Sequence, residues 1–216
     1  MHPIGGTLPA PESDRIAPCA GLARCFRHAA ELTLPGLIGL ASALLLLKDI
    51  AAAESDYKVV RPPTHVVGTA VPAPEGPVIL TVSGKILPPD GRAEIAFDRA
   101  GLESLGVVSF TTATNWTDGA TVFEGVLLKN VLEAVQIAPD SKELLLTALN
   151  DYQAVMPVED ALDWPVILAF KENGRELSVR DRGPLWVVYP CHVNDRFATR
   201  LYLSRWVWQL ASISVR

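Results

Sequence analysis

The sequence predicts a single α+β domain in which β-strands dominate. The chain has 216 residues, which is the length of one ordinary domain or of one domain plus a leader. Most apolar residues lie in short, β-branched runs separated by Gly- and Pro-containing turns, a pattern typical of strands. Only residues 125–136 show a clear helical spacing of apolar residues. A hydrophobic content of 49% excludes general disorder, and a net charge of −5 argues against a nucleic-acid binder.

The elements follow from local signals along the chain. Strands are expected at residues 78–83, 93–97, 107–112, 144–149, 166–170, 176–179, 185–189 and 206–215. Asp98 is placed to cap a short helix that ends at Gly106. Asn173-Gly174 is a strong hairpin signal between two of the strands. The prediction is therefore seven or eight strands with two or three short helices.

The N-terminal part of the chain is typical of an export signal. Residues 37–47 carry no charge, but they are too few to cross a bilayer, which takes roughly 20 apolar residues. Arg24 and Arg27 precede this run, and Ala51-Ala52-Ala53 follows it as a cleavage site. We interpret residues 1–53 as a signal peptide rather than a buried helix, because the run has no polar face. The mature protein would be periplasmic and not itself membrane-spanning.

Cleavage would leave about 163 residues, the same net charge of −5 and a single cysteine, Cys191. Residues 54–77 are rich in proline and are expected to form an extended linker or an arm on the domain surface. Residues 78–216 form the predicted domain.

Several common chemistries are missing from the sequence. It has neither of the glycine-rich phosphate-binding loops nor a Gly-x-Ser-x-Gly motif. Cys191 and His192 are adjacent, so on an extended segment their side chains point to opposite faces and do not readily share a metal ion. No catalytic residue and no metal ligand is therefore assigned.

Three segments place polar side chains beside an aromatic ring at a strand end. They are residues 111–119, 150–152 and 179–186. An aromatic ring, a carboxylate and Asn or Arg side chains together suit a flat, polar heterocycle. The alternative is that each segment is an ordinary capped turn, with a surface ion pair between Arg180 and Asp181.

The same segments carry a family resemblance. The order is Phe110-Thr-Thr-x-Thr-x-Trp116-x-Asp-Gly119, Ala148-x-Asn-Asp-Tyr152, Arg180-Asp-x-Gly-Pro-Leu185, Tyr189-Pro190, Arg205 and Trp208-Gln-Leu210. This order resembles the short exported proteins of the oxidoreductase molybdopterin-binding domain family, whose fold is that of the sulfite oxidase catalytic domain. The resemblance covers about residues 78–215.

The resemblance implies that the protein binds a pterin or molybdopterin. The cofactor-binding residues would be Thr114, Trp116, Asn150, Asp151, Tyr152, Arg180, Asp181 and Arg205. Trp116 and Tyr152 would form walls of the site, and Asp151 or Asp181 would pair with the amino edge of the pterin. Catalytic members bind molybdenum through a cysteine that this chain lacks between Ser109 and Trp116. Hydroxyl groups are poor substitutes for a soft thiolate, so no molybdenum is expected.

Three functions are compatible with this sequence. The leading hypothesis is a periplasmic, pterin-binding, non-catalytic regulator that acts on the periplasmic domain of a membrane cyclic-di-GMP enzyme, as some short members resembling this chain do. The first alternative is a molybdenum-cofactor oxidoreductase that lacks the usual cysteine ligand or uses Cys191. The second is a scaffold or redox-accessory domain with an empty pocket.

Overall fold

The computed structural model describes residues 56–216, and the predicted signal peptide lies outside them. The strands are β1 (Lys58–Arg61), β2 (Leu80–Gly84), β3 (Glu94–Phe97), β4 (Val107–Ala113), β5 (Ala120–Leu127), β6 (Glu143–Ala148), β7 (Gln153–Pro157), β8 (Ile167–Glu172), β9 (Arg175–Glu176), β10 (Trp186–Val188) and β11 (Leu210–Val215). The helices are α1 (Arg99–Ser104), α2 (Leu128–Val135), α3 (Val158–Asp163) and α4 (Arg200–Leu203). Short 3-10 helices span Val179–Asp181 and Asp195–Ala198.

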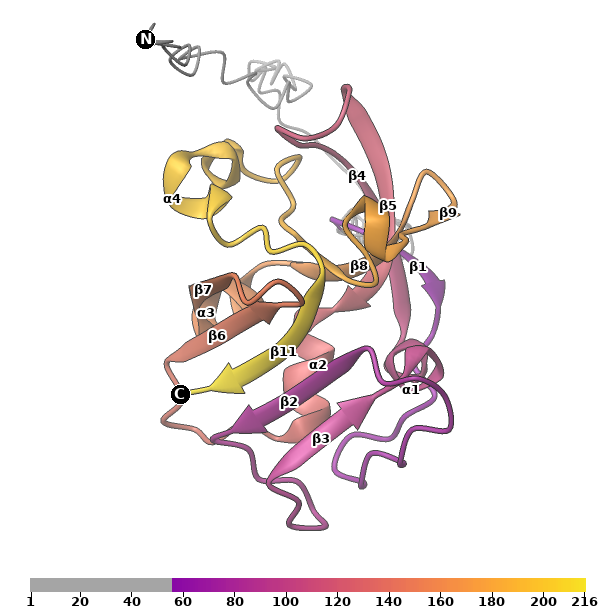
Figure 1. Cartoon of the computed structure of the whole chain (residues 1–216), viewed down its shortest axis with the longest axis vertical. Helices are drawn as coiled ribbons and strands as arrows, with labels where there is room; N and C mark the ends of the chain where they lie inside the picture. Colours follow the sequence, from indigo (N-terminus) through magenta and orange to yellow (C-terminus); the bar gives the residue numbers. More distant parts are fainter. Residues whose placement is uncertain (1–55) are drawn as a thin grey trace, which may run out of the picture.

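The strands form two sheets (Figure 1). The first has the order β1-β4-β5-β8-β10, with β9 paired to β8, and the second has the order β3-β2-β11-β6-β7. Neighbouring strands are antiparallel except β2 and β11, which run parallel. The prediction of a mostly β, α+β domain is therefore confirmed.

The core lies between the sheets and helix α2, which passes behind β2 and β11 in Figure 1. Leu128, Val131 and Leu132 of α2 are fully buried, which is the helical spacing that the sequence showed. The helix begins at residue 128, however, and not at residue 125. Gly125 belongs to β5, where a Cβ atom would lie 2.3 Å from the carbonyl oxygen of Leu168, so the pairing of β5 with β8 needs a glycine here.

Other elements also differ from the prediction. Strands β5 and β7 and helix α3 were not predicted. In β5 the first buried position is Thr121 and the apolar Val122 is exposed, so the sequence does not show the alternation that marks a half-buried strand. The expected strand 176–179 ends at Glu176 and gives way to a 3-10 helix. The expected strand 206–215 begins only at Leu210, because Gln209 has a φ of 52°, which a strand does not accommodate.

The proline-rich segment lies against the domain as an arm. Its strand β1 pairs with β4, with Lys58 opposite Ser109. The amide groups of Thr64 and His65 both donate to the carbonyl oxygen of Ser104, at 2.8 and 2.9 Å. Val71 is only 4% exposed, so the arm contributes to the core.

Asp98 joins the arm to the first helix. One carboxylate oxygen accepts a hydrogen bond from the amide of Gly101 at 2.7 Å and caps α1. The other accepts from the amides of Gly76 and Glu75, at 2.7 and 2.9 Å. Because the amides of Gly101 and Gly76 stabilise the charged form, the pKa of Asp98 lies below its ordinary value of 3.8.

Replacement of Asp98 should therefore destabilise the protein in a pH-dependent manner. We expect Asp98→Asn to lower the free energy of unfolding at pH 7 by about 1–2 kcal/mol, because an amide holds these three donors less well than a carboxylate. A lowered folded-state pKa adds stability above the unfolded-state value and loses it as the pH falls. Urea unfolding should therefore show the gap to wild type closing below about pH 4. A gap that is the same at pH 3 and pH 7 would contradict this role.

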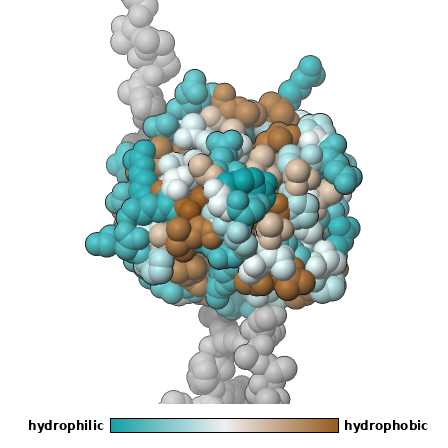
Figure 2. All heavy atoms as spheres, turned by 90° about the horizontal axis from the view of Figure 1, so that it is seen from below, coloured by the Kyte–Doolittle hydropathy of each residue, from teal (hydrophilic) through white to brown (hydrophobic). Residues whose placement is uncertain are grey.

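The described residues contain no helix with the length and apolar character needed to cross a bilayer. On the face seen from below, hydrophobic residues form several separate clusters between hydrophilic ones (Figure 2). Strands β8 and β9, which the predicted site segment 179–186 follows in the chain, lie in the upper half of the view in Figure 1.

Candidate functional site

The three polar and aromatic segments meet at residues 204–209. The Trp116 ring lies 5.6 Å from that of Trp206 and 5.9 Å from that of Trp208, measured between ring centroids. The Tyr152 hydroxyl donates to the carbonyl oxygen of Ser204 at 3.0 Å. The amide of Gln209 donates to the carbonyl oxygen of Arg182 at 2.7 Å. The structure thus brings together the three segments that the sequence singled out.

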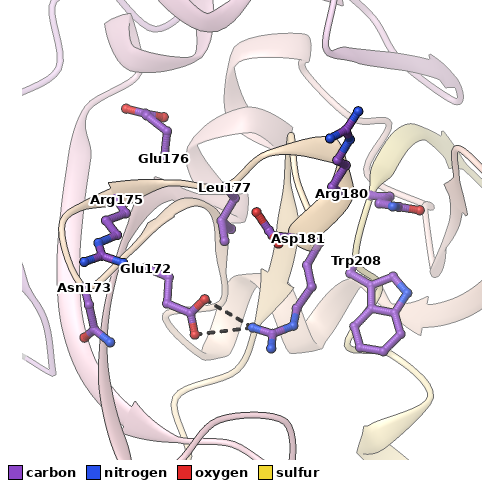
Figure 3. Close-up of a pocket in the computed structure, with 10 residues that line it drawn as sticks. Glu172, Asn173, Arg175, Glu176, Leu177, Arg180, Asp181 and Trp208 are labelled. Carbon is purple, nitrogen blue, oxygen red and sulfur yellow. Dashed lines mark hydrogen bonds and ion pairs between the residues drawn. The ribbon is translucent and has the colours of Figure 1, made fainter.

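An open cleft of about 980 Å³ lies at one side of this meeting point (Figure 3). It is lined by Glu172, Asn173, Arg175, Glu176, Leu177, Arg180, Asp181, Arg182, Trp208 and Gln209. Ligand pockets in proteins usually have volumes of roughly 300–1,000 Å³, so the cleft has room for a small molecule.

Arg182 holds the floor of the cleft together. Its Nη1 atom donates to both carboxylate oxygens of Glu172, at 3.3 and 3.2 Å, as the dashed lines in Figure 3 show. Its Nη2 atom donates to the carbonyl oxygen of Trp116 at 3.0 Å. Its guanidinium group also lies 4.8 Å from the ring centroid of Trp186. The Arg182 side chain therefore fixes three parts of the fold relative to one another: strand β8, strand β10 and the loop that follows β4.

Gly183, beside Arg182, is needed for close packing of the backbone. A Cβ atom at this position would lie 2.0 Å from the carbonyl oxygen of Leu177. The amide of Gly183 donates to the carbonyl oxygen of Ser178 at 2.7 Å. This contact explains why the Arg-Asp-x-Gly motif requires a glycine.

Two of the three carboxylates in the cleft are neutralised by cations. Glu172 pairs with Arg182 at 3.2 Å. Glu176 pairs with Arg99 at 2.7 Å and with Lys171 at 3.9 Å. These ion pairs are part of the wall and leave little charge for a ligand.

Three other charges in the cleft remain available. Asp181 accepts a hydrogen bond from the hydroxyl of Ser178 at 2.7 Å, a neutral partner. Arg175 and Arg180 make no ion pair within residues 56–216, and they lie on either side of Asp181 in Figure 3. A carboxylate and two guanidinium groups that line the same cleft are complementary to a ligand that has both donor and acceptor groups.

The other predicted site residues do not line the cleft. Thr114 accepts a hydrogen bond from the amide of Trp116 at 3.1 Å and so shapes the loop behind Trp208. Asn150 accepts from the amide of Tyr152 at 3.2 Å. Asp151 is exposed and has a φ of 63°, as expected for a residue in a tight turn. None of these five residues lines the cleft, and this includes Trp116 and Tyr152, which were expected to form its walls. Trp116 instead packs against Trp208.

Arg205 is committed to a buried ion pair. Its Nη1 atom donates to Asp160 at 2.6 Å, and the hydroxyl of Tyr189 donates to the same carboxylate oxygen at 2.8 Å. Burial and the negative charge of Asp160 raise the pKa of Tyr189 well above its ordinary value, so its phenol is neutral. This network ties α3 to the C-terminal segment rather than facing the cleft.

Sequence reasoning missed eight of the ten residues that line the cleft. They are Glu172, Asn173, Arg175, Glu176, Leu177, Arg182, Trp208 and Gln209. Arg182 lies inside a predicted segment, and Trp208 and Gln209 belong to a motif that carries the resemblance. Arg182, Trp208 and Gln209 could have been found from their position in these sequence motifs. Only the fold shows that they line the same cleft as Asp181.

The described residues offer few ligands for a metal ion. Cys191 is 1% exposed and packs in the core. Within residues 56–216, His, Cys, Asp and Glu side chains do not form any group of three or more that is placed to hold a metal ion. The polar side-chain groups that line the cleft carry nitrogen and oxygen atoms.

The fold and the cleft define a small-molecule-binding domain that is mostly β. The chain belongs to the oxidoreductase molybdopterin binding domain family, whose model matches residues 98–205, half of the chain. It is similar to a solved structure, the sulfane dehydrogenase SoxCD from Paracoccus pantotrophus, at 18% identity and a TM-score of 0.48. That match covers 63% of this chain and 37% of the solved chain, so this chain spans little more than a third of its neighbour's length. No curated protein sequence matches this chain.

Arg182 should contribute more to the stability of the protein than Arg180, which lines the same cleft. We expect Arg182→Ala to lower the free energy of unfolding by about 1–3 kcal/mol, because it leaves Glu172 and the Trp116 carbonyl without their donor. The matched control is Arg180→Ala, which removes a guanidinium that makes no ion pair in the described part of the chain and should change stability by less than about 0.5 kcal/mol.

Urea unfolding measures both effects, and hydrogen exchange should show faster exchange at residues 113–119 only in the Arg182→Ala protein. Equal losses of stability in the Arg182→Ala and Arg180→Ala proteins would contradict the proposed role of Arg182 in holding the cleft together.

Proposed function

We propose that this protein binds a pterin, either free or as the organic part of molybdopterin, in the cleft beside Trp208. The observation that carries the proposal is the Asp181 carboxylate, which lines the cleft and whose side-chain partner within residues 56–216 is a hydroxyl group and not a cation. A pterin presents an amino group and a ring N–H along one edge, and a carboxylate accepts hydrogen bonds from both. Family membership supports the same class of ligand.

The remaining cleft residues match the other parts of such a ligand. Trp208 is 37% exposed and offers an indole surface on which a flat ring can stack. Arg180 supplies donors for a carbonyl oxygen or an anionic side chain, and Arg175 supplies them at the other end of the cleft. Of the two carboxylates that the sequence offered for the amino edge, Asp181 lines the cleft and Asp151 does not.

The donor set fits the pterin better than it fits molybdenum. The polar groups of the cleft are carboxylates, guanidinium groups, amides and an indole, and none of the residues that line it carries sulfur. Molybdopterin, when bound, supplies the same pterin edge that Asp181 is placed to recognise. We therefore infer that the ligand is held without a bond from a protein thiolate to a metal.

A regulatory role is supported by the surface beside the cleft. Leu149, Val179 and Trp208 are 52%, 54% and 37% exposed, and we call them the apolar rim. Gln209 holds two of them in place, because its side chain donates to the carbonyl oxygen of Val179 and its carbonyl accepts from the amide of Leu149. A ligand stacked on Trp208 would change this surface, which supports ligand-dependent association with a partner.

The partner proposed is the periplasmic domain of a membrane cyclic-di-GMP enzyme. Two sequence features support this partner: the predicted signal peptide, which would deliver the domain to the periplasm, and the resemblance to short exported regulators. In this proposal the protein is a sensor of the pterin and not a catalyst.

Pterin binding can be tested by calorimetry with dihydroneopterin. We expect Asp181→Ala to weaken binding by about 1–3 kcal/mol, because the amino edge loses its acceptor. The matched control is Asp151→Ala, an exposed carboxylate outside the cleft, which should leave the dissociation constant unchanged.

Three outcomes would contradict the proposal. Equal affinities of the Asp181→Ala and wild-type proteins would remove Asp181 from the site. Molybdenum at about one atom per chain in the protein as purified would favour the oxidoreductase alternative. An unchanged melting temperature with dihydroneopterin would favour the empty-pocket scaffold, because specific binding must stabilise the native state.

A further inference from the structure

A continuous series of oxidisable rings leads from the cleft into the core. Trp208 lines the cleft, and its ring centroid lies 5.9 Å from that of Trp116. Trp116 lies 5.6 Å from Trp206, and Trp206 lies 6.0 Å from Tyr189. Tryptophan and tyrosine lose an electron more easily than any other aromatic side chain. Because each ring contacts the next, an electron can move along the series in short steps.

The last ring of the series has a proton acceptor. The hydroxyl of Tyr189 donates to Asp160 at 2.8 Å, and both residues are buried, at 0% and 7% exposure. The raised pKa of Tyr189 keeps the phenol protonated at neutral pH. A phenol that loses an electron becomes a strong acid, so the proton of Tyr189 would pass to the carboxylate that already accepts its hydrogen bond.

A cation makes one side branch of the series unfavourable. The guanidinium of Arg182 lies 4.8 Å from the Trp186 ring, and that of Arg205 lies 4.9 Å from the Tyr202 ring. A positive charge beside a ring opposes removal of an electron from it, whereas a carboxylate favours that removal. The charge of Arg182 therefore disfavours oxidation of Trp186. Arg205 also pairs with Asp160 beside Tyr189, so its charge does not distinguish Tyr189 from Tyr202; what favours Tyr189 is that its hydroxyl donates to the Asp160 carboxylate.

We propose that this series carries an oxidising equivalent away from the cleft to Tyr189. A one-electron oxidant at the cleft takes one electron from Trp208. An electron then moves from Trp116 to Trp208, from Trp206 to Trp116 and from Tyr189 to Trp206. The O–H bond of Tyr189 breaks, a new O–H bond forms on Asp160, and the result is a neutral tyrosyl radical beside a neutral carboxylic acid. The activity would spare the exposed indole of Trp208 from lasting oxidation. It is independent of the pterin proposal, since any one-electron oxidant that reaches Trp208 is sufficient.

Flash photolysis of the full chain with photogenerated tris(bipyridine)ruthenium(III) tests the proposal. We expect optical and electron paramagnetic resonance spectra of a neutral tyrosyl radical. Tyr189→Phe, which keeps the ring, should abolish that signal. Trp206→Phe should leave a tryptophan radical instead, because the series is interrupted. Asp160→Asn should lower the tyrosyl yield, because the proton acceptor is lost.

The matched control is Tyr152→Phe, since Tyr152 is 47% exposed and lies outside the series. The tyrosyl signal should persist in that variant. A tyrosyl signal that persists in Tyr189→Phe, or that disappears in Tyr152→Phe, would overturn the proposal. Thermal unfolding of each variant verifies that it is folded, and Trp206→Phe provides an independent test of the route.

Discussion

The guanidinium of Arg182 is the contact on which the candidate site depends. It joins the carboxylate of Glu172 on β8 to the carbonyl oxygen of Trp116 in the loop after β4. The backbone carbonyl oxygen of Arg182 accepts a hydrogen bond from the amide of Gln209, and this bond positions the segment before β11. A planar group with several fixed donors can hold two partners at once, which a lysine cannot do in the same geometry. Trp208 and Asp181 therefore face the same cleft because Arg182 fixes the segments that carry them.

Much of the fold was predictable, since it follows from local signals. Asp98 caps α1 as expected, and the spacing of Leu128, Val131 and Leu132 marks α2. Gly125 gave no such signal, because its role depends on the backbone of Leu168 in a distant strand. In the candidate site, too, some residues could be found from local signals and others only from contacts between distant segments. Arg180 and Asp181 could be singled out within one motif, whereas the roles of Glu172 and Trp208 depend on contacts between distant segments.

The structure separates the residues of the cleft from those of a buried ion pair, although the sequence predicted a single site. Arg205 was expected near the ligand, but it pairs with Asp160 in the core and does not line the cleft that contains Asp181. Trp208 belongs to both parts of the molecule, since it lines the cleft and begins the series of rings that ends at Tyr189. Ligand recognition and redox protection would thus meet at one exposed indole. Both are compatible with a family that binds a redox-active cofactor.

The central claim is that a pterin binds against Trp208. The chain has five tryptophans, so the indole N–H signals in a nitrogen-15 NMR spectrum report on five known positions. Titration with dihydroneopterin should shift the signals of Trp208 and of its neighbour Trp116. It should leave that of Trp164 unchanged, because Trp164 packs against Phe197, away from the residues that line the cleft. Binding that leaves the Trp208 signal unchanged would contradict the account.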